Sequence, residues 1–195
     1  MIYHSGTINV VGASFSNGIF ASATGGSATV TTDRGTTINV SQLAQGDIAQ
    51  VGIEAFASTN GATTVTAGST ITVNGNGNPI ADFRSQPRGI MLQSNLGGPA
   101  SVTYTGPGIT VQGGGGIGLV AVSGSQDATT ASGSVTVDAS RATGPINADG
   151  SNAIGILADS GTLRNTAQNR PTTLIPGRCR SLQATCPPKA NSAPQ

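Results

Sequence analysis

The sequence predicts an all-β protein, a right-handed parallel β-helix (a solenoid) of about five coils with three short strands per coil. Three observations lead to this prediction. The composition is rich in glycine and poor in charge, apolar residues alternate with Thr, Ser and Asn, and a unit of strands repeats along the chain. Together they favour a narrow core of small side chains enclosed by stacked coils.

The composition differs from that of an ordinary soluble domain. The 195 residues include 29 Gly and no Trp, and only 9% are charged and 3% aromatic, whereas about 25% charged residues are typical. Such a composition can indicate disorder. Here, however, Ile, Val and Ala alternate with polar residues in short runs bounded by Gly and Asn, which is typical of half-buried strands.

The first strand of the repeat starts with glycine and has the pattern Gly-Ile/Leu-x-Ala. It recurs five times, at residues 18–21, 52–55, 89–92, 118–121 and 155–158. The copies are 29 to 37 residues apart, which leaves room for two more strands in each interval.

Those two strands are visible in each interval. The second is centred at Val30, Val65, Val102 and Val135, and the third at Ile38, Ile71, Ile109 and Ile146. Residues 7–10 have the pattern of residues 37–40, so the chain opens in mid-repeat. Glycine and asparagine at 74–78 and 113–116 supply the backbone freedom that sharp corners need.

Two alternative folds fit the sequence less well. A β-propeller has blades of about 40 to 50 residues with recurrent aromatic marks, and no aromatic mark recurs here. An antiparallel sandwich fits the three-strand period less well. We therefore expect residues 1–163 to form the β-helix.

Residues 164–195 differ from this body. They hold five of the ten prolines, five basic residues, no acid, and both cysteines, Cys179 and Cys186. This composition predicts a disordered tail. The tail has no aromatic residues and scattered charge, so we expect it to bind no nucleic acid.

The repeated glycine strand, the Thr-Ile-x-Val strand and the Gly/Ser/Thr/Asn-rich corners resemble the passenger regions of bacterial type V autotransporters and related surface adhesins. The resemblance covers about residues 6–163 and concerns repeat style and composition, without a signature motif. It implies export to the cell surface or secretion, a β-helical stalk, and roles in adhesion and virulence. The implied partners are macromolecules of host or bacterial surfaces, or neighbouring passenger coils.

The chain departs from this family in two respects. We find no signal peptide at the amino terminus, and no room for the membrane barrel that would translocate the passenger. We therefore expect a partial chain, whose contact with a membrane would depend on a barrel domain absent from this sequence.

Candidate catalytic and cofactor motifs are weak. Residues 113–118 match GxGxxG, with Asp138 twenty residues beyond, but the following residues are too few and too β-branched for the helix that would meet a phosphate. We interpret the motif as a coil corner and expect no cofactor.

Acidic residues show no convergent pair of the kind that glycoside hydrolysis needs. Asp33 with Arg34, and Asp82 with Arg84, are interpreted as solvated ion pairs in loops. Asp127, Asp138 and Asp149 recur every eleven residues without the calcium-binding repeat, and are interpreted as turn residues.

Other reactive groups are sparse. His4 is the only histidine, so neither a catalytic triad nor a histidine metal site is expected. Asn39 begins a glycosylation sequon that lies in a predicted strand, where such a motif is usually incidental. We therefore expect a protein that is not an enzyme.

One column of side chains is a candidate contact surface. In the first strand the residue after Gly points inward and the next points outward. The outward column contains Glu54 and four apolar residues, which we call the contact stripe: Phe20, Met91, Val120 and Leu157. An exposed apolar stripe marks a contact surface, unless the chain's own loops cover it. The equivalent column of the third strand is polar: Asn9, Asn39, Thr72, Thr110 and Asn147.

The sequence thus favours a structural or adhesive surface module that presents a binding face. A β-helical carbohydrate-active enzyme is the alternative from another class, and a non-functional truncated product is the third possibility.

Overall fold

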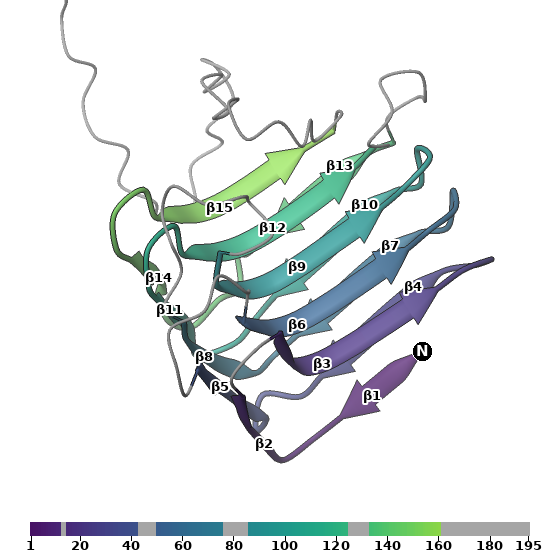
Figure 1. The fold of residues 1–195 in the computed structure, drawn as a ribbon. Helices are drawn as coiled ribbons and strands as arrows, with labels where there is room; N and C mark the ends of the chain where they lie inside the picture. Colours follow the sequence, from purple (N-terminus) through teal and green to yellow (C-terminus); the bar gives the residue numbers. More distant parts are fainter. Residues whose placement is uncertain (13–14, 43–49, 76–85, 125–132, 161–195) are drawn as a thin grey trace, which may run out of the picture.

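The computed structural model describes residues 1–12, 15–42, 50–75, 86–124 and 133–160. These residues form fifteen β-strands and no helix. The strands build a right-handed parallel β-helix, which climbs from β1 at the bottom of Figure 1 to β15 at the top. The right-handed course is the one that parallel crossover connections almost always take. The predicted fold class is confirmed.

Each turn contributes one strand to each of three parallel sheets, which we name A, B and C. Sheet A contains β1 (Ile2–His4), β4 (Ala28–Thr32), β7 (Thr63–Ala67), β10 (Ala100–Tyr104) and β13 (Val135–Asp138). Sheet B contains β2 (Thr7–Gly12), β5 (Thr37–Gln42), β8 (Thr70–Asn74), β11 (Gly108–Gln112) and β14 (Ile146–Asp149). Sheet C contains β3 (Ser16–Ala23), β6 (Gln50–Ala57), β9 (Arg88–Ser94), β12 (Ile117–Ser123) and β15 (Ile154–Asp159).

Like residues stack on like residues along the axis of the helix. In sheet B, Ile8, Ile38, Ile71, Ile109 and Ile146 are paired in register from turn to turn. In sheet C the equivalent column is Ile19, Ile53, Ile90, Leu119 and Ile156. β-Branched side chains pack well on a pleated surface, so these columns explain why the segments form strands.

The core lies between the three sheets. The inward residues of β4 to β12 are almost fully enclosed, and Val30, Ile38, Ile53, Val65 and Ile90 have no exposed surface. The inward residues of β1, β2, β13 and β14 are only partly buried. About three turns are therefore enclosed on both sides, fewer than the five coils expected, with a more exposed turn at each end.

Each sheet C strand has a glycine as its second or third residue, and in β6 the side-chain position of this glycine points into the core. A Cβ on Gly52 would lie 2.5 Å from Ile71 Cγ2 and 2.5 Å from the carbonyl oxygen of Gly89. Gly52 is skipped in the pairing register, between the pairs of Val51 and Ile53. Two successive positions, Gly52 and Ile53, thus face the interior, and only glycine fits the first.

The corner between sheets A and B is closed by a buried tyrosine. The hydroxyl of Tyr104 donates a hydrogen bond to the carbonyl of Ser69 (3.1 Å) and accepts one from the backbone N–H of Gly108 (2.9 Å). Burial raises the pKa of Tyr104 to about 12. This side chain therefore links two successive turns at one corner.

Two details differ from the sequence prediction. β1 was not predicted, although it pairs with β4 in sheet A. In β13, Val137 rather than Val135 lies opposite Val102, because Val135 and Val137 fit the same alternation and the pattern could not choose between them. The predicted tail at 164–195, with Cys179 and Cys186, lies outside the described residues.

Candidate functional site

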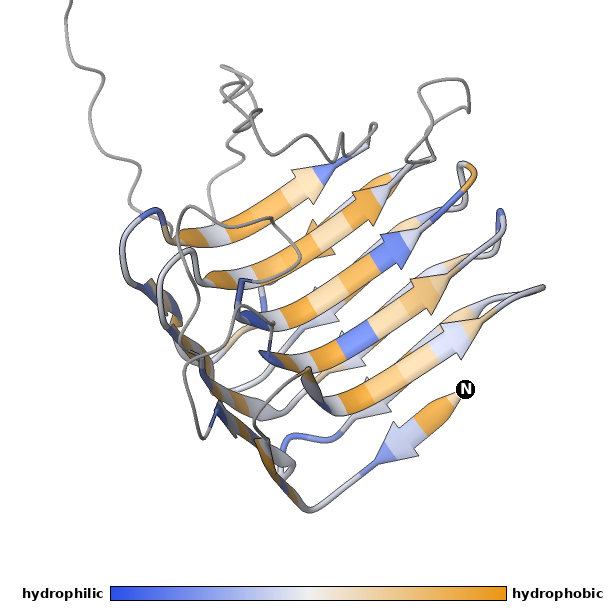
Figure 2. Cartoon of the chain, in the orientation of Figure 1, coloured by the Kyte–Doolittle hydropathy of each residue, from blue (hydrophilic) through white to orange (hydrophobic). Residues whose placement is uncertain are grey.

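The outer face of sheet C carries the predicted contact stripe. Its register is as predicted, since Phe20, Glu54, Met91, Val120 and Leu157 pair in order. In Figure 2 the strands of this sheet are coloured largely as hydrophobic residues, with hydrophilic residues in β6 and β9. The face is therefore apolar as expected, and its exposure decides whether a partner can reach it.

The sequence left open whether the stripe is exposed or covered by the chain's own loops, and the structure shows a stripe that is exposed only in part. Phe20 is 51% exposed and Leu157 is half-buried, but Met91 and Val120 are only 5% and 0% exposed. Met91 and Val120 belong to a second apolar cluster on this face, which contains Val51, Met91, Ile117, Val120 and Val122. Because one chain alone produces this burial, its own atoms cover the middle of the stripe. Contact with a partner stays a prediction at Phe20 and Leu157.

A polar group lies within this apolar face. Asn17 donates a hydrogen bond to Glu54 Oε2 (2.8 Å), and Arg88, which is 2% exposed, donates one to the sulfur of Met91 (3.1 Å). Burial raises the pKa of Glu54, while the hydrogen bond from Asn17 and the positive charge of Arg88 oppose that rise. The attraction to Arg88 does not fully offset the loss of water around Glu54.

Sequence reasoning missed this group. The available signal was the single acid in an otherwise apolar column, together with a basic residue directly before Gly89. Asn17 and Arg88 occupy one outward column, with Val51 between them. The carboxylate of Glu54 thus has a neutral donor and a cation on adjacent strands.

The outer face of sheet A is polar and uncharged over most of its area. Two columns of hydroxyl residues run across it in register. The first contains Thr29, Thr64, Ser101 and Thr136, and the second contains Thr31, Thr66 and Thr103. All of these residues are exposed or half-buried. We call this surface the hydroxyl face.

The outer face of sheet B has the polar column that the sequence predicts. Asn9, Asn39, Thr72, Thr110 and Asn147 pair in order. Asn39 Nδ2 donates a hydrogen bond to Asn9 Oδ1 (2.8 Å), which links the side chains of two successive turns. The Asn39 sequon lies in β5, as expected for an incidental match.

The GxGxxG match is a coil corner, as predicted. Residues 113–116 connect β11 to β12, and Gly113 and Gly115 have positive φ angles of 123° and 71°. The N–H of Gly116 bonds to the carbonyl of Gly113 (3.1 Å). A strand follows the glycines, so the helix amino terminus that a phosphate needs is not there.

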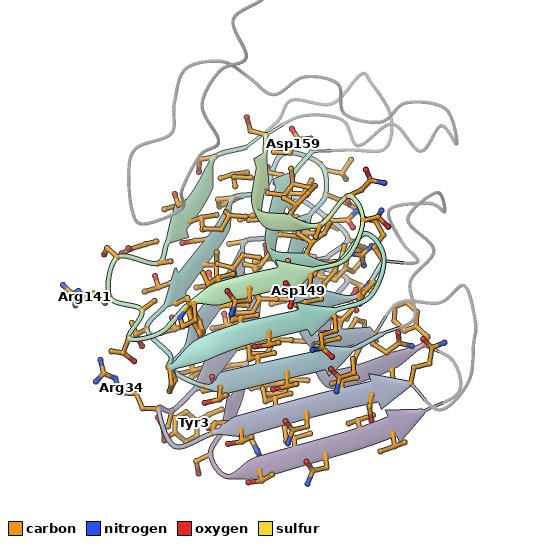
Figure 3. All side chains as sticks on the ribbon, turned by 90° about the vertical axis from the view of Figure 1, so that its left-hand side faces the viewer. Tyr3, Arg34, Arg141, Asp149 and Asp159 are labelled. Carbon is orange, nitrogen blue, oxygen red and sulfur yellow. The ribbon has the colours of Figure 1, made fainter. Side chains whose placement is uncertain are left out.

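The acidic candidates lie apart from one another. Asp33 accepts a hydrogen bond from the hydroxyl of Tyr3, and Arg34 projects from a corner of the stack, as does Arg141 (Figure 3). Asp138 accepts hydrogen bonds from the N–H (2.9 Å) and hydroxyl (2.7 Å) of Ser140, which lower its pKa. That contact is typical of a turn-forming aspartate.

Asp82, Arg84 and Asp127 lie outside the described residues. Within the part of the chain that the structure describes, no group of three or more His, Cys, Asp or Glu side chains could hold a metal ion. His4 lies in β1, and Asp149 and Asp159 end β14 and β15.

Comparisons with known proteins give no relative. No protein-family model matches the chain, and no curated protein or solved structure is significantly similar to it. Among the described residues, no helix is long and apolar enough to span a membrane.

Proposed function

We propose that this chain is a structural and adhesive module of a bacterial surface, a part of an autotransporter-like passenger. Its role is to extend as a rigid rod and to hold its outer faces toward surface macromolecules of host cells or other bacteria. The repeat style of the sequence supports the family, and the stacked parallel sheets support the rod.

The hydroxyl face is the observation that carries the adhesive part of the proposal. Its Thr and Ser residues repeat at the strand spacing of about 4.8 Å, on a sheet whose backbone is fixed by bonds to both neighbours. A rigid array of identical groups suits a repetitive partner such as a polysaccharide, because many weak contacts then add together.

The experiment measures adhesion of beads coated with the purified chain. The probes are cultured epithelial cells, bacterial cells, and surfaces coated with a neutral polysaccharide. In the test variant Thr64, Thr66 and Thr103 are replaced by Val, which keeps the β-branched shape and removes the hydroxyls. In the control, Thr72 and Thr110 of sheet B are replaced by Val.

We expect beads with the natural chain and the control to adhere, and beads with the hydroxyl-face variant to lose adhesion. Equal adhesion of the test variant and the natural chain would reject the hydroxyl face as the binding surface. If natural-chain beads adhered to none of the probes beyond beads with an unrelated β-protein, the adhesive function itself would be rejected.

A further inference from the structure

The hydroxyl face is regular in two directions. Each of its rows consists of two outward side chains of one strand, two residues apart. The three complete rows are Thr29 with Thr31, Thr64 with Thr66, and Ser101 with Thr103. Neighbouring strands lie about 4.8 Å apart, and residues two apart along a strand are separated by about 6.6 Å. The hydroxyl groups therefore occupy the points of a nearly rectangular net.

The inward residues hold the rows of this net at one height. A valine separates the two members of each row, and Val30, Val65 and Val102 have no exposed surface. The strands β4, β7 and β10 pair residue for residue over five positions, without a skipped residue. Because identical side chains lie beneath every row, no row stands above its neighbours.

Threonine places two chemical groups at each point of the net. Its branched side chain has few χ1 rotamers, so both groups are held in fixed directions. The hydroxyl donates and accepts hydrogen bonds, and the methyl group restricts the orientation of the water beside it. The three complete rows contain no charged side chain that would reorient this water. The face is therefore suited to hold a layer of water in a regular arrangement.

Ice has the surface that matches this net. On the prism faces of ordinary ice the oxygen atoms repeat along two perpendicular directions, at spacings close to those between strands and between alternate residues. Water held by the hydroxyl and methyl groups can then belong to the crystal lattice. We propose that the hydroxyl face binds the prism faces of ice crystals through such a layer of bridging water.

Many lattice points are bound at once, so contacts that are weak singly add together. The inference goes beyond the proposed adhesive role and does not depend on it, since it requires only the geometry of sheet A.

The other polar face lacks an equivalent net. The outward column of sheet B that contains Asn9 and Asn39 mixes amides with hydroxyls. The column beside it contains Thr37 and Thr70 but continues to Gly108, which has no side chain. The rows of sheet B are therefore neither uniform nor complete, and this face provides the control.

The experiment grows single ice crystals in solutions of the purified full chain. It measures thermal hysteresis, the gap between the melting temperature of a crystal and the lower temperature at which the crystal resumes growth. The test variant is Thr66→Lys, which raises a long charged side chain from an exposed point in the middle of the net. A second test variant, Thr103→Lys, changes another row. The matched control is Thr72→Lys, the same substitution within β8 of sheet B. Circular dichroism and thermal unfolding check that all three variants keep the fold.

We expect the natural chain and Thr72→Lys to shape ice crystals and to show thermal hysteresis that increases with protein concentration. Thr66→Lys and Thr103→Lys should lose it, because the raised side chain keeps the net away from the crystal. Natural chain that carries a fluorescent label should coat the prism faces and leave the basal faces bare.

A natural chain with neither thermal hysteresis nor adsorption to ice would overturn the proposal. Equal hysteresis of Thr66→Lys and the natural chain would overturn it as well, and so would an equal loss in Thr72→Lys. The solutions contain neither cells nor polysaccharide, so a negative result here would leave the adhesive proposal standing, and a failure of adhesion would leave this one standing.

Discussion

At the scale of single residues, glycine decides where each sheet C strand can meet sheet B. The sequence shows the glycine at the start of every repeat, and its recurrence was enough to find the strands. It does not show that the glycine faces the core, because strict alternation assigns it to the outside. Only the packing of Gly52 against Ile71 Cγ2 and the Gly89 carbonyl reveals why no side chain fits.

We therefore predict that Gly52→Ala destabilises the protein by about 1 to 3 kcal/mol, the usual cost of overpacking a core. The control is Gly25→Ala, at a site with nothing within 4 Å and no positive φ angle. That change should alter stability by no more than about 1 kcal/mol, and in the stabilising direction. Chemical denaturation measures both. Equal effects of the two substitutions would contradict the inward position of Gly52.

Glu54 gives a prediction with a definite sign. Its pKa is raised in the folded protein, so the protonated form is favoured there and stability decreases as pH rises through that pKa. Glu54→Gln removes this pH-dependent loss. We expect the variant to unfold at a higher temperature than the natural chain at pH about 7, with the difference shrinking as pH falls below about 4. A variant that is less stable at neutral pH would show that the charge of Glu54 stabilises the fold.

At the scale of strands, most of the architecture could be predicted from the sequence. The Ile columns of sheets B and C were found in the correct register, because glycine and Thr-Ile-x-Val mark each copy. β1 was missed because Ile2–His4 is only three residues long. The side chain that joins β10 to β11 was also missed, since a single tyrosine forms no pattern.

That tyrosine yields the prediction at this scale. Tyr104→Phe leaves the carbonyl of Ser69 and the N–H of Gly108 without their hydroxyl partner, which should cost about 1 to 3 kcal/mol. The control is Tyr3→Phe, because Tyr3 is 61% exposed. Loss of the Tyr3 hydroxyl should change the free energy of unfolding by less than about 1 kcal/mol.

The same corner has a pH dependence. The folded pKa of Tyr104 is about 12 against an ordinary value of 10.0, so its contribution is complete below pH 10 and is lost as pH rises toward 12. The chain has two tyrosines and no Trp, so absorbance titration of Tyr3→Phe follows Tyr104 alone. A midpoint near 10 would contradict the buried hydroxyl.

At the scale of the whole molecule, the three faces were harder to predict than the fold. Alternation shows which side chains point outward, but not what covers them, and so the sequence left open whether Met91 and Val120 are exposed or covered. The hydroxyl face was overlooked for a related reason. Thr and Ser on a strand are ordinary in any sequence, and their columns become a surface only when the register of β4, β7, β10 and β13 is known.

The central claim is the parallel stacking of successive turns, and distances between spin labels test it most directly. Cysteines are introduced in pairs at Asn9 with Thr72 and at Asn9 with Asn147, with Cys179 and Cys186 replaced by Ser. Labelled chain is diluted with unlabelled chain, so that only distances within one copy are measured.

The two pairs are two and four strands apart in sheet B. At about 4.8 Å per strand their backbone separations should be about 10 and 19 Å. Both distance distributions should be narrow, because the backbone of the sheet is fixed by bonds between neighbouring strands. Electron paramagnetic resonance should therefore show a separation that doubles from the first pair to the second. Broad distributions centred well beyond four strand spacings would contradict the β-helix.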